Sequence, residues 1–237
     1  MHPYQLVFRF SLALTLIAGA LVPALAAGPT GLLNDTGQTE CDDGSNFMQW
    51  CYSDNSGDAA PMPSQDARYG RDRAPLNKVG GGMAGFDFTK VCMDGTLNCT
   101  TAADTTSSPA STAWACTKDN VTNLIWSLNT MGRTSWNVAS TGTYPDSGHN
   151  TANRCGFSTG WRLPTRRELA SIVHLGAINL TIDTNYFPST MNSWYWSSDT
   201  FAIDPGEAWV VRFDTGVLRT NCKPCFTSYV RLVRSGP

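Results

Sequence analysis

Apolar and polar residues alternate over the last third of the chain, from Trp194 onward. The clearest alternation covers residues 207–213, where one face would carry Trp209, Val211 and Phe213 and the other would show Arg212. The turn residues 214–216 follow, and alternation resumes at 217–219. A period of two is typical of a strand with one buried face, so the pattern predicts a hairpin over 207–219 and a closing strand over 229–234.

A different period precedes these strands. Thr165 and Glu168 form a T-x-x-E capping box, in which each residue satisfies a backbone amide of the other at a helix start. The spacing of Leu169, Ile172 and Val173 gives that helix a buried face, and the helix is expected to end near Gly176. His174 would then lie in its last turn, where a histidine complements the helix dipole or packs.

Another hairpin is predicted further upstream, because the turn residues 119–123 separate the apolar stretches 114–116 and 124–126. The stretch 133–153 is polar and rich in turn residues, with Trp136 and Tyr144 as its expected buried anchors.

Residues 28–112 are rich in Gly, Asp, Ser, Thr and Pro, which predicts a loop-rich part with short strands. Residues 113–237 would form the core, in one continuous domain with the preceding part. Residues 54–58 place oxygen side chains at alternate positions, as a calcium loop does. The EF-hand pattern fails, since Gly57 is at the fourth position and Gln65 replaces the bidentate glutamate, so a turn is preferred and no metal is predicted.

The N-terminus has the pattern of a secretory signal peptide. Arg9 precedes the apolar run 10–25, and small residues at 24–27 suit cleavage after Ala26 or Ala27. Residues 1–27 are therefore interpreted as a signal, with an uncleaved anchor as the alternative. No later apolar run is long enough to span a bilayer. A secreted, periplasmic or cell-surface location is expected.

Eight cysteines follow the signal, and an even number in an exported chain favours disulfides. The close pairs Cys41 with Cys51 and Cys92 with Cys99 would tie local loops, which leaves Cys116 with Cys155 as a longer bridge and Cys222 with Cys225 as a tight one. The sequence leaves the connectivity open. Zinc binding or redox activity at the C-x-x-C of Cys222 and Cys225 is the alternative, although zinc would require two more ligands.

Charge is divided unevenly along the chain. Residues 28–159 hold 8 basic and 13 acidic residues, whereas residues 160–237 hold 8 basic and 6 acidic ones. This balance argues against a nucleic-acid partner. Ordinary solvated faces explain it most simply; the sharper interpretation is a basic C-terminal surface that contacts anionic groups.

Several ordered motifs together resemble the Lcl C-terminal domain family, whose members are bacterial extracellular domains named after the C-terminal domain of a collagen-like adhesin. The motifs cover most of the chain after the signal, most densely from residue 114. They are Thr36-Gly37-Gln38-Thr39 with Cys41, residues 119–126, Cys155-Gly156, residues 161–169, Ile182-Asp183, Tyr186-Phe187-Pro188, residues 195–198 and residues 229–234.

This resemblance implies a fold near those of C-type lectins and formylglycine-generating enzymes, and the adhesin member implies binding of sulfated glycosaminoglycans. The chain departs from the family at Asn123, where glycine is usual, and in the segment 133–153, which is shorter than in many relatives. It has no collagen-like repeat and no Glu-Pro-Asn or Trp-Asn-Asp sugar-chelating motif. The spacing of Cys222 and Cys225 differs from that of the active cysteines in formylglycine-generating enzymes.

We therefore expect an α+β, C-type-lectin-like fold: a twisted antiparallel sheet, at least one capped helix and long disulfide-tied loops. The expected function is a secreted or surface-displayed adhesion module that binds a glycan, without cofactor. The candidate ligand-binding residues are Arg212, Arg219, Lys223 and Trp194. One alternative is a structural or protein-interaction subunit of a surface appendage. The other is a formylglycine-generating-type oxidoreductase that uses copper and a cysteine pair.

Catalysis has little support in the residues. After the signal the chain has only two histidines, His149 and His174, and no Ser/His/Asp group or spaced carboxylate pair stands out. No catalytic residue is predicted.

Overall fold

The computed structural model describes residues 34–41, 49–50, 71, 77–141, 150 and 153–237. Four predicted features lie outside these residues: the signal peptide 1–27, the turn at 54–58, the half-cystine Cys51 and the anchor Tyr144.

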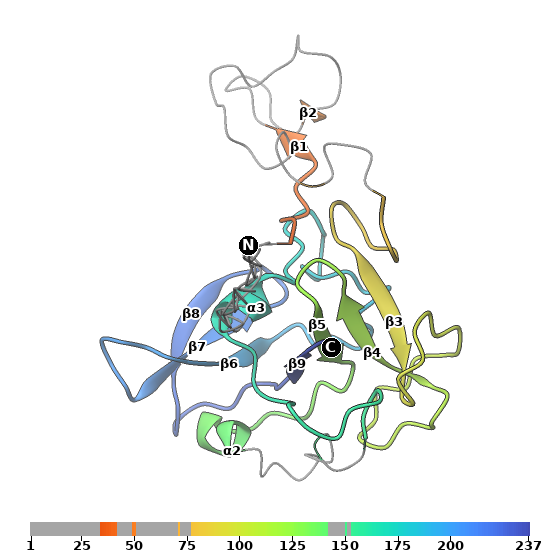
Figure 1. Ribbon diagram of the computed structural model, residues 1–237. Coiled ribbons are helices and arrows are strands. Elements are labelled where there is room, and N and C mark those ends of the chain that lie inside the picture. The colour runs from red at the N-terminus through yellow and green to blue at the C-terminus, as the bar shows by residue number, and fades with distance from the viewer. Residues whose placement is uncertain (1–33, 42–48, 51–70, 72–76, 142–149, 151–152) are drawn as a thin grey trace, which may run out of the picture. The chain divides into compact units, whose positions relative to one another are not determined.

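The described chain is mostly β, with antiparallel sheets and few helices (Figure 1). A four-stranded sheet has the order β3-β4-β5-β9, a three-stranded sheet has the order β6-β7-β8, and β1 pairs with β2. The strands are β1 (Glu40–Cys41), β2 (Gln49–Trp50), β3 (Phe88–Cys92), β4 (Trp114–Asp119), β5 (Leu124–Ser127), β6 (Trp194–Thr200), β7 (Glu207–Arg212), β8 (Leu218–Cys222) and β9 (Val233–Ser235). The helices are α2 (Trp136–Ser140) and α3 (Arg166–Ala170).

The predicted hairpin around residues 119–123 is confirmed as β4 and β5, with Asp119 opposite Leu124. Asn123 at its turn has a φ of 57°. Asparagine enters this left-handed region more readily than most residues because its short amide can bond locally, although glycine enters it freely. The family-atypical residue at this position thus satisfies the same backbone requirement.

The second predicted hairpin is confirmed as β7 and β8, in which Val211 lies opposite Leu218 and Gly216 has a φ of 70°. The expectation that β7 buries only one face was wrong. Val211 belongs to one apolar cluster and Val210 to another, and both side chains have an exposed fraction of 0%. The core therefore lies on both sides of β7.

The two sheets are joined through the segment before β9. Tyr195 of β6 bridges to Tyr229, and the Leu232 carbonyl accepts from the Ser127 amide of β5 at 3.0 Å. Arg231 between them is fully buried and donates to the Ser127 carbonyl at 2.8 Å and to the Thr190 hydroxyl at 2.9 Å. The predicted closing strand 229–234 is thus a connector that touches both sheets, with a regular strand only at its end.

The helix predicted to reach Gly176 is shorter. α3 ends at Ala170, and the amides of His174 and Leu175 take acceptors outside the helix. The His174 amide donates to the Thr181 carbonyl at 2.8 Å, and the Leu175 amide donates to the Thr36 carbonyl at 2.8 Å. His174 therefore lies beyond the helix, buried in a loop. The apolar residues Leu169, Ile172 and Val173 are nevertheless buried.

Three of the four predicted disulfides are present among the described residues: Cys92–Cys99, Cys116–Cys155 and Cys222–Cys225. Cys222 and Cys225 are bonded to each other and not held as a pair of zinc ligands. Within the described ranges, no helix is long and apolar enough to cross a membrane.

The fourth predicted disulfide includes a residue that the structure does not describe. It would join Cys41 to Cys51, and Cys51 lies outside the described residues, although Cys41 ends the described strand β1. The bond between Cys41 and Cys51 is therefore not one of the disulfides that the structure describes, and it stays a prediction.

Candidate functional site

The three-stranded sheet places three of the four predicted site residues on one of its faces. Trp194 of β6 lies opposite Arg212 of β7, and Arg219 of β8 lies opposite Val210 of β7. Cross-strand partners share a face, and positions two apart on a strand share it too. Trp194, Arg212 and Arg219 are therefore brought to the same side from three different strands.

These three side chains form what we term the basic aromatic cluster. The guanidinium carbon of Arg219 lies 3.9 Å from the centre of the Trp194 ring, and that of Arg212 lies 5.5 Å from it. Both distances are within the range of cation–π attraction. The Trp194 indole is half-buried against the core, so it is a fixed support for the two guanidinium groups.

The two arginines differ in whether a carboxylate neutralises their positive charge. Arg212 forms an ion pair with Asp214 at 2.6 Å, which neutralises it locally. Arg219 is exposed, and no carboxylate of the described chain lies within ion-pair distance of it. Its guanidinium donors therefore face solvent, and Arg219 is the base of the cluster that is best placed to meet an anion.

Lys223 lies apart from this cluster. It is four residues beyond Arg219 on the same chain segment, about 13 Å at the rise of a strand. Its ammonium donates to the Thr200 hydroxyl at 2.8 Å and to the Pro205 carbonyl at 2.9 Å, and it lies 4.1 Å from the centre of the Trp136 ring. These contacts tie the end of β8 to neighbouring loops. The structure thus brings together three of the four predicted residues and gives Lys223 structural contacts.

A similar arrangement, which the sequence reasoning missed, involves Arg166 at the start of α3. Its guanidinium carbon is 4.6 Å from the centre of the Trp209 ring, and Asp199 is 4.0 Å from its Nε. Trp209 is one residue from Val210, so this pair lies on the opposite face from the basic aromatic cluster. Only the pairing of β6, β7 and α3 reveals it.

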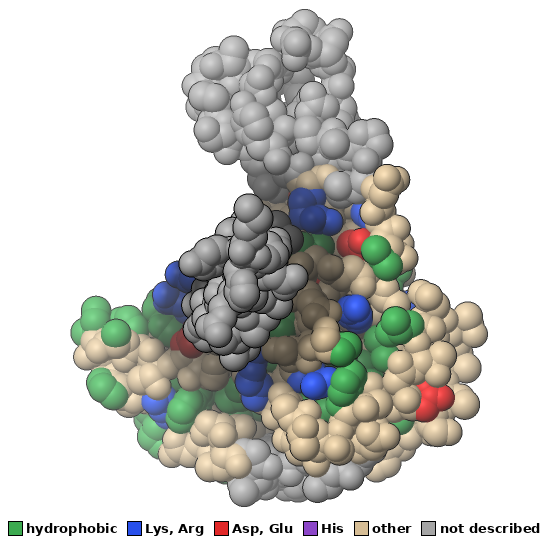
Figure 2. Space-filling model, in the orientation of Figure 1, with side chains coloured by type: hydrophobic (Ala, Val, Ile, Leu, Met, Phe, Trp, Pro, Cys, Tyr) green, Lys and Arg blue, Asp and Glu red, His purple; other side chains and the backbone are tan. Residues whose placement is uncertain are grey.

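Basic side chains are scattered over the visible face in Figure 2, among hydrophobic and uncharged groups and with few acidic side chains between them. Arg162 is engaged within the fold, because its guanidinium forms an ion pair with Glu168 at 2.7 Å.

The structure therefore defines a mostly β, disulfide-linked domain with an arginine–tryptophan cluster on one sheet. The model of the Lcl C-terminal domain matches residues 115–234. This match covers half of the chain and includes both site-bearing hairpin strands, so the chain belongs to the Lcl C-terminal domain family, as its motifs predicted. No curated protein matches the chain significantly.

Proposed function

We propose that this chain is a secreted or surface-displayed binding module that recognises an acidic glycan at the basic aromatic cluster. Arg219 carries the proposal: it is exposed, supported by the Trp194 indole at 3.9 Å and without a carboxylate partner among the described residues. Such a guanidinium can donate two parallel hydrogen bonds to a sulfate or carboxylate group.

Membership of the family supports an extracellular role, since the family is named after a domain of an adhesin. The three disulfides support an oxidising compartment. We also propose that the two sheets and the capped helix α3 form a variant of the C-type-lectin-like fold. In this proposal the chain binds its ligand without catalysis, cofactor or metal.

Binding to immobilised heparin and to a neutral polysaccharide, measured from low to high salt, tests this function. Exposed ion pairs are screened over about 8 Å at physiological ionic strength, so affinity for the acidic ligand should fall steeply as salt is added. Stacking of neutral sugars on tryptophan would show little salt dependence. Equal binding of both ligands at all salt concentrations would contradict an anionic site.

Variants locate the contact within the sheet. Arg219→Gln should weaken heparin binding by about fivefold, the upper end for one exposed ion pair. Lys223→Gln should have a smaller effect, because that ammonium already donates to Thr200 and Pro205. Arg167→Gln removes a charge from an exposed side chain of α3 and is the matched control. Equal losses in all three variants would indicate a diffuse charge effect and contradict a defined site.

The chief alternative is a structural or protein-interaction subunit of a surface appendage. Such a subunit would bind no purified glycan under any salt condition.

A second alternative, a copper-dependent oxidoreductase, needs a cysteine pair that can be reduced and bind copper. Cys222 and Cys225 are only three residues apart and are bonded to each other. Copper binding by the mildly reduced protein, followed by absorption spectroscopy, would favour that alternative.

A further inference from the structure

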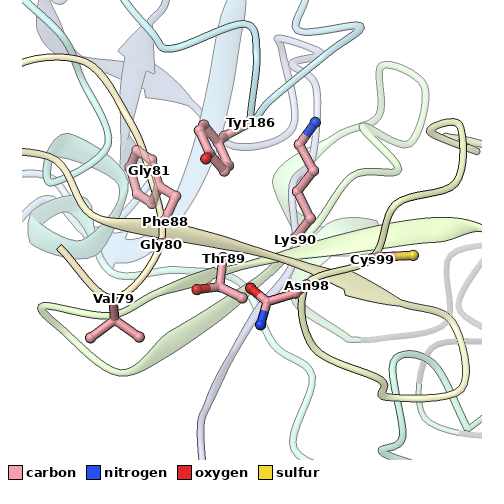
Figure 3. Close-up of a pocket in the computed structure, with 9 residues that line it drawn as sticks. All are labelled: Val79, Gly80, Gly81, Phe88, Thr89, Lys90, Asn98, Cys99 and Tyr186. Carbon is pink, nitrogen blue, oxygen red and sulfur yellow. The ribbon is translucent and has the colours of Figure 1, made fainter.

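The four-stranded sheet carries a pocket at the free edge of β3, with a volume of about 330 Å³ (Figure 3). We propose that this edge pocket is a second ligand site, which binds a small organic carboxylate about the size of one sugar acid. The residues that carry the proposal are Lys90, Asn98, Tyr186 and Gly81. They belong to the other sheet and its loops, so the site is separate from the basic aromatic cluster.

One backbone amide at this edge has no acceptor among the described residues. β3 is the outermost strand of its sheet (Figure 1). In an antiparallel sheet, the backbone groups of such a strand that face outward alternate with those that bond its neighbour, here β4. Phe88 exchanges two hydrogen bonds with Gly81, at 2.8 and 2.6 Å, and the Lys90 carbonyl accepts from the Cys99 amide at 3.1 Å. Between these two contacts the Lys90 N–H faces outward, and no described residue accepts from it.

Polar side chains flank this edge of β3 on both sides: the Lys90 side chain extends toward Tyr186, and Asn98 lies on the side of Thr89 (Figure 3). The Lys90 ammonium is held between two rings, 4.0 Å from the centre of Trp114 and 5.6 Å from that of Tyr186, with no carboxylate of the described residues in ion-pair distance. Asn98 has a φ of 58° and an exposed amide that bonds no described group. A side chain at Gly81 would collide with the Tyr186 hydroxyl, so glycine keeps that hydroxyl at the pocket.

The Asp87 carboxylate, which bonds two backbone amides of the pocket, is already engaged by three donors. Asp87 accepts from the Val79 and Gly80 amides at 2.9 Å each and from the Asn120 side chain at 2.8 Å. Partial burial opposes ionisation of Asp87, but these hydrogen bonds hold its pKa below the usual range. Asp87 therefore stays ionised with three donors of its own, and it does not need the donors of Lys90, Asn98 or Tyr186.

The hydrogen-bond donors that line the pocket indicate the class of ligand. The pocket offers a backbone N–H, an ammonium, an amide NH₂ and a phenolic O–H, so donors outnumber acceptors. A carboxylate accepts several hydrogen bonds and balances the ammonium charge. The volume is near the lower end of the range of about 300–1,000 Å³ for small-molecule sites, which suits one sugar acid better than a longer chain. The Tyr186 ring adds an apolar wall.

Titration of the ¹⁵N-labelled protein with sodium glucuronate, followed by amide NMR spectra, tests the proposal. The Lys90 and Asn98 resonances should move in a saturable way, because the ligand would bond groups that no described residue bonds. Methyl glucoside, the neutral counterpart, should move them little. Absence of saturable shifts with glucuronate, or equal shifts with methyl glucoside, would overturn the proposal.

Three variants test whether glucuronate binds at the edge pocket. Asn98→Asp places a negative charge beside the ligand, while aspartate still tolerates the positive φ; it should lower the affinity for glucuronate by about tenfold or more, as expected for loss of a hydrogen bond to a charged group. Lys90→Met keeps an unbranched side chain on Trp114 and should cause a similar loss. Arg219→Gln should change nothing here, whereas loss of glucuronate binding in that variant would assign the signal to the basic aromatic cluster and overturn the second site.

Discussion

Glu168 links Arg162 to the first turn of α3. Its two carboxylate oxygens accept from the Arg162 guanidinium at 2.8 and 2.7 Å, and Oε2 also accepts from the Thr165 amide at 2.7 Å. The Thr165 hydroxyl in return accepts from the Glu168 amide at 3.2 Å. One carboxylate therefore serves an ion pair and a capping box at once, where the chain turns from the Trp161–Pro164 segment into the helix.

Replacement of Glu168 by glutamine tests this double role. Burial opposes ionisation of Glu168, but the bonds from Arg162 and Thr165 hold its pKa below the usual range. A lowered pKa in the folded state means stability that is present above the unfolded pKa of about 4.3 and is lost as pH falls through the folded value. Glu168→Gln should cost about 1 kcal/mol at pH 7, since Arg162 is partly exposed.

The cost of Glu168→Gln should shrink in denaturant titrations as the pH is lowered from 7 toward 3, because a growing fraction of the wild-type carboxylate is then protonated. A cost that is the same at pH 7 and pH 3 would show that the charge of Glu168 contributes nothing.

Asn123 offers a test of the turn between β4 and β5. At a φ of 57°, alanine suffers a steric penalty that asparagine tolerates and glycine avoids. Asn123→Ala should therefore lower the free energy of unfolding by about 1 kcal/mol, whereas Asn123→Gly should leave it nearly unchanged. Thermal unfolding of the two variants measures the difference, and equal stability of both would contradict the strained turn.

The Cys116–Cys155 disulfide closes a loop between residues 39 apart in sequence, whereas Cys222–Cys225 closes one between residues three apart. On the chain-entropy model, longer loops gain more from closure. Replacing both cysteines of the first pair by alanine should cost about 4 kcal/mol, and the same change in the second about 1–2 kcal/mol. Urea unfolding ranks the variants, and the reverse ranking would show that loop entropy does not dominate.

The burial of His174 leads us to expect a lower free energy of unfolding in mild acid. It is 3% exposed, its two ring nitrogens bond no described group, and its ring centre is 5.4 Å from that of Phe86. Desolvation lowers its pKa, with Asp183 and Asp35 opposing this weakly. The folded state therefore binds a proton less readily than the unfolded state, and stability is lost as pH falls below the unfolded pKa of about 6.5.

The free energy of unfolding should consequently fall between about pH 7 and pH 5, before most carboxylates titrate. His174→Gln should flatten this part of the profile, because glutamine is uncharged throughout the range. An unchanged slope in the variant would assign the pH dependence to other groups.

The sequence located the elements that depend on near neighbours. The β4–β5 and β7–β8 turns, the pairing of Thr165 with Glu168 and the disulfides Cys92–Cys99 and Cys222–Cys225 involve residues close together in the chain. Local propensity and short loop closure suffice to place such features. The family motifs could also be recognised in the sequence, because they occur in a fixed order.

The length of α3 and the burial of β7 were not predictable, because both depend on distant residues. The amides of His174 and Leu175 donate to the Thr181 and Thr36 carbonyls, so the helix that begins at Arg166 does not continue to Gly176. β7 is covered on both faces because the core continues on either side of its sheet. The alternation of apolar and polar residues along β7 predicts one exposed face. It cannot show that a second layer of the core covers that face.

The sequence by itself therefore determined the family, the hairpins, the cap and the residue types of the candidate site. Tertiary structure alone decided how those residues are grouped. Arg219 meets Trp194 only because the three strands align them on one face, whereas Lys223 is drawn away by Thr200 and Pro205. The edge pocket is likewise invisible in the sequence, since Lys90, Asn98 and Tyr186 come together only when two loops flank the free edge of β3. A binding site is a set of distances between residues far apart in the chain, and only packing fixes those distances.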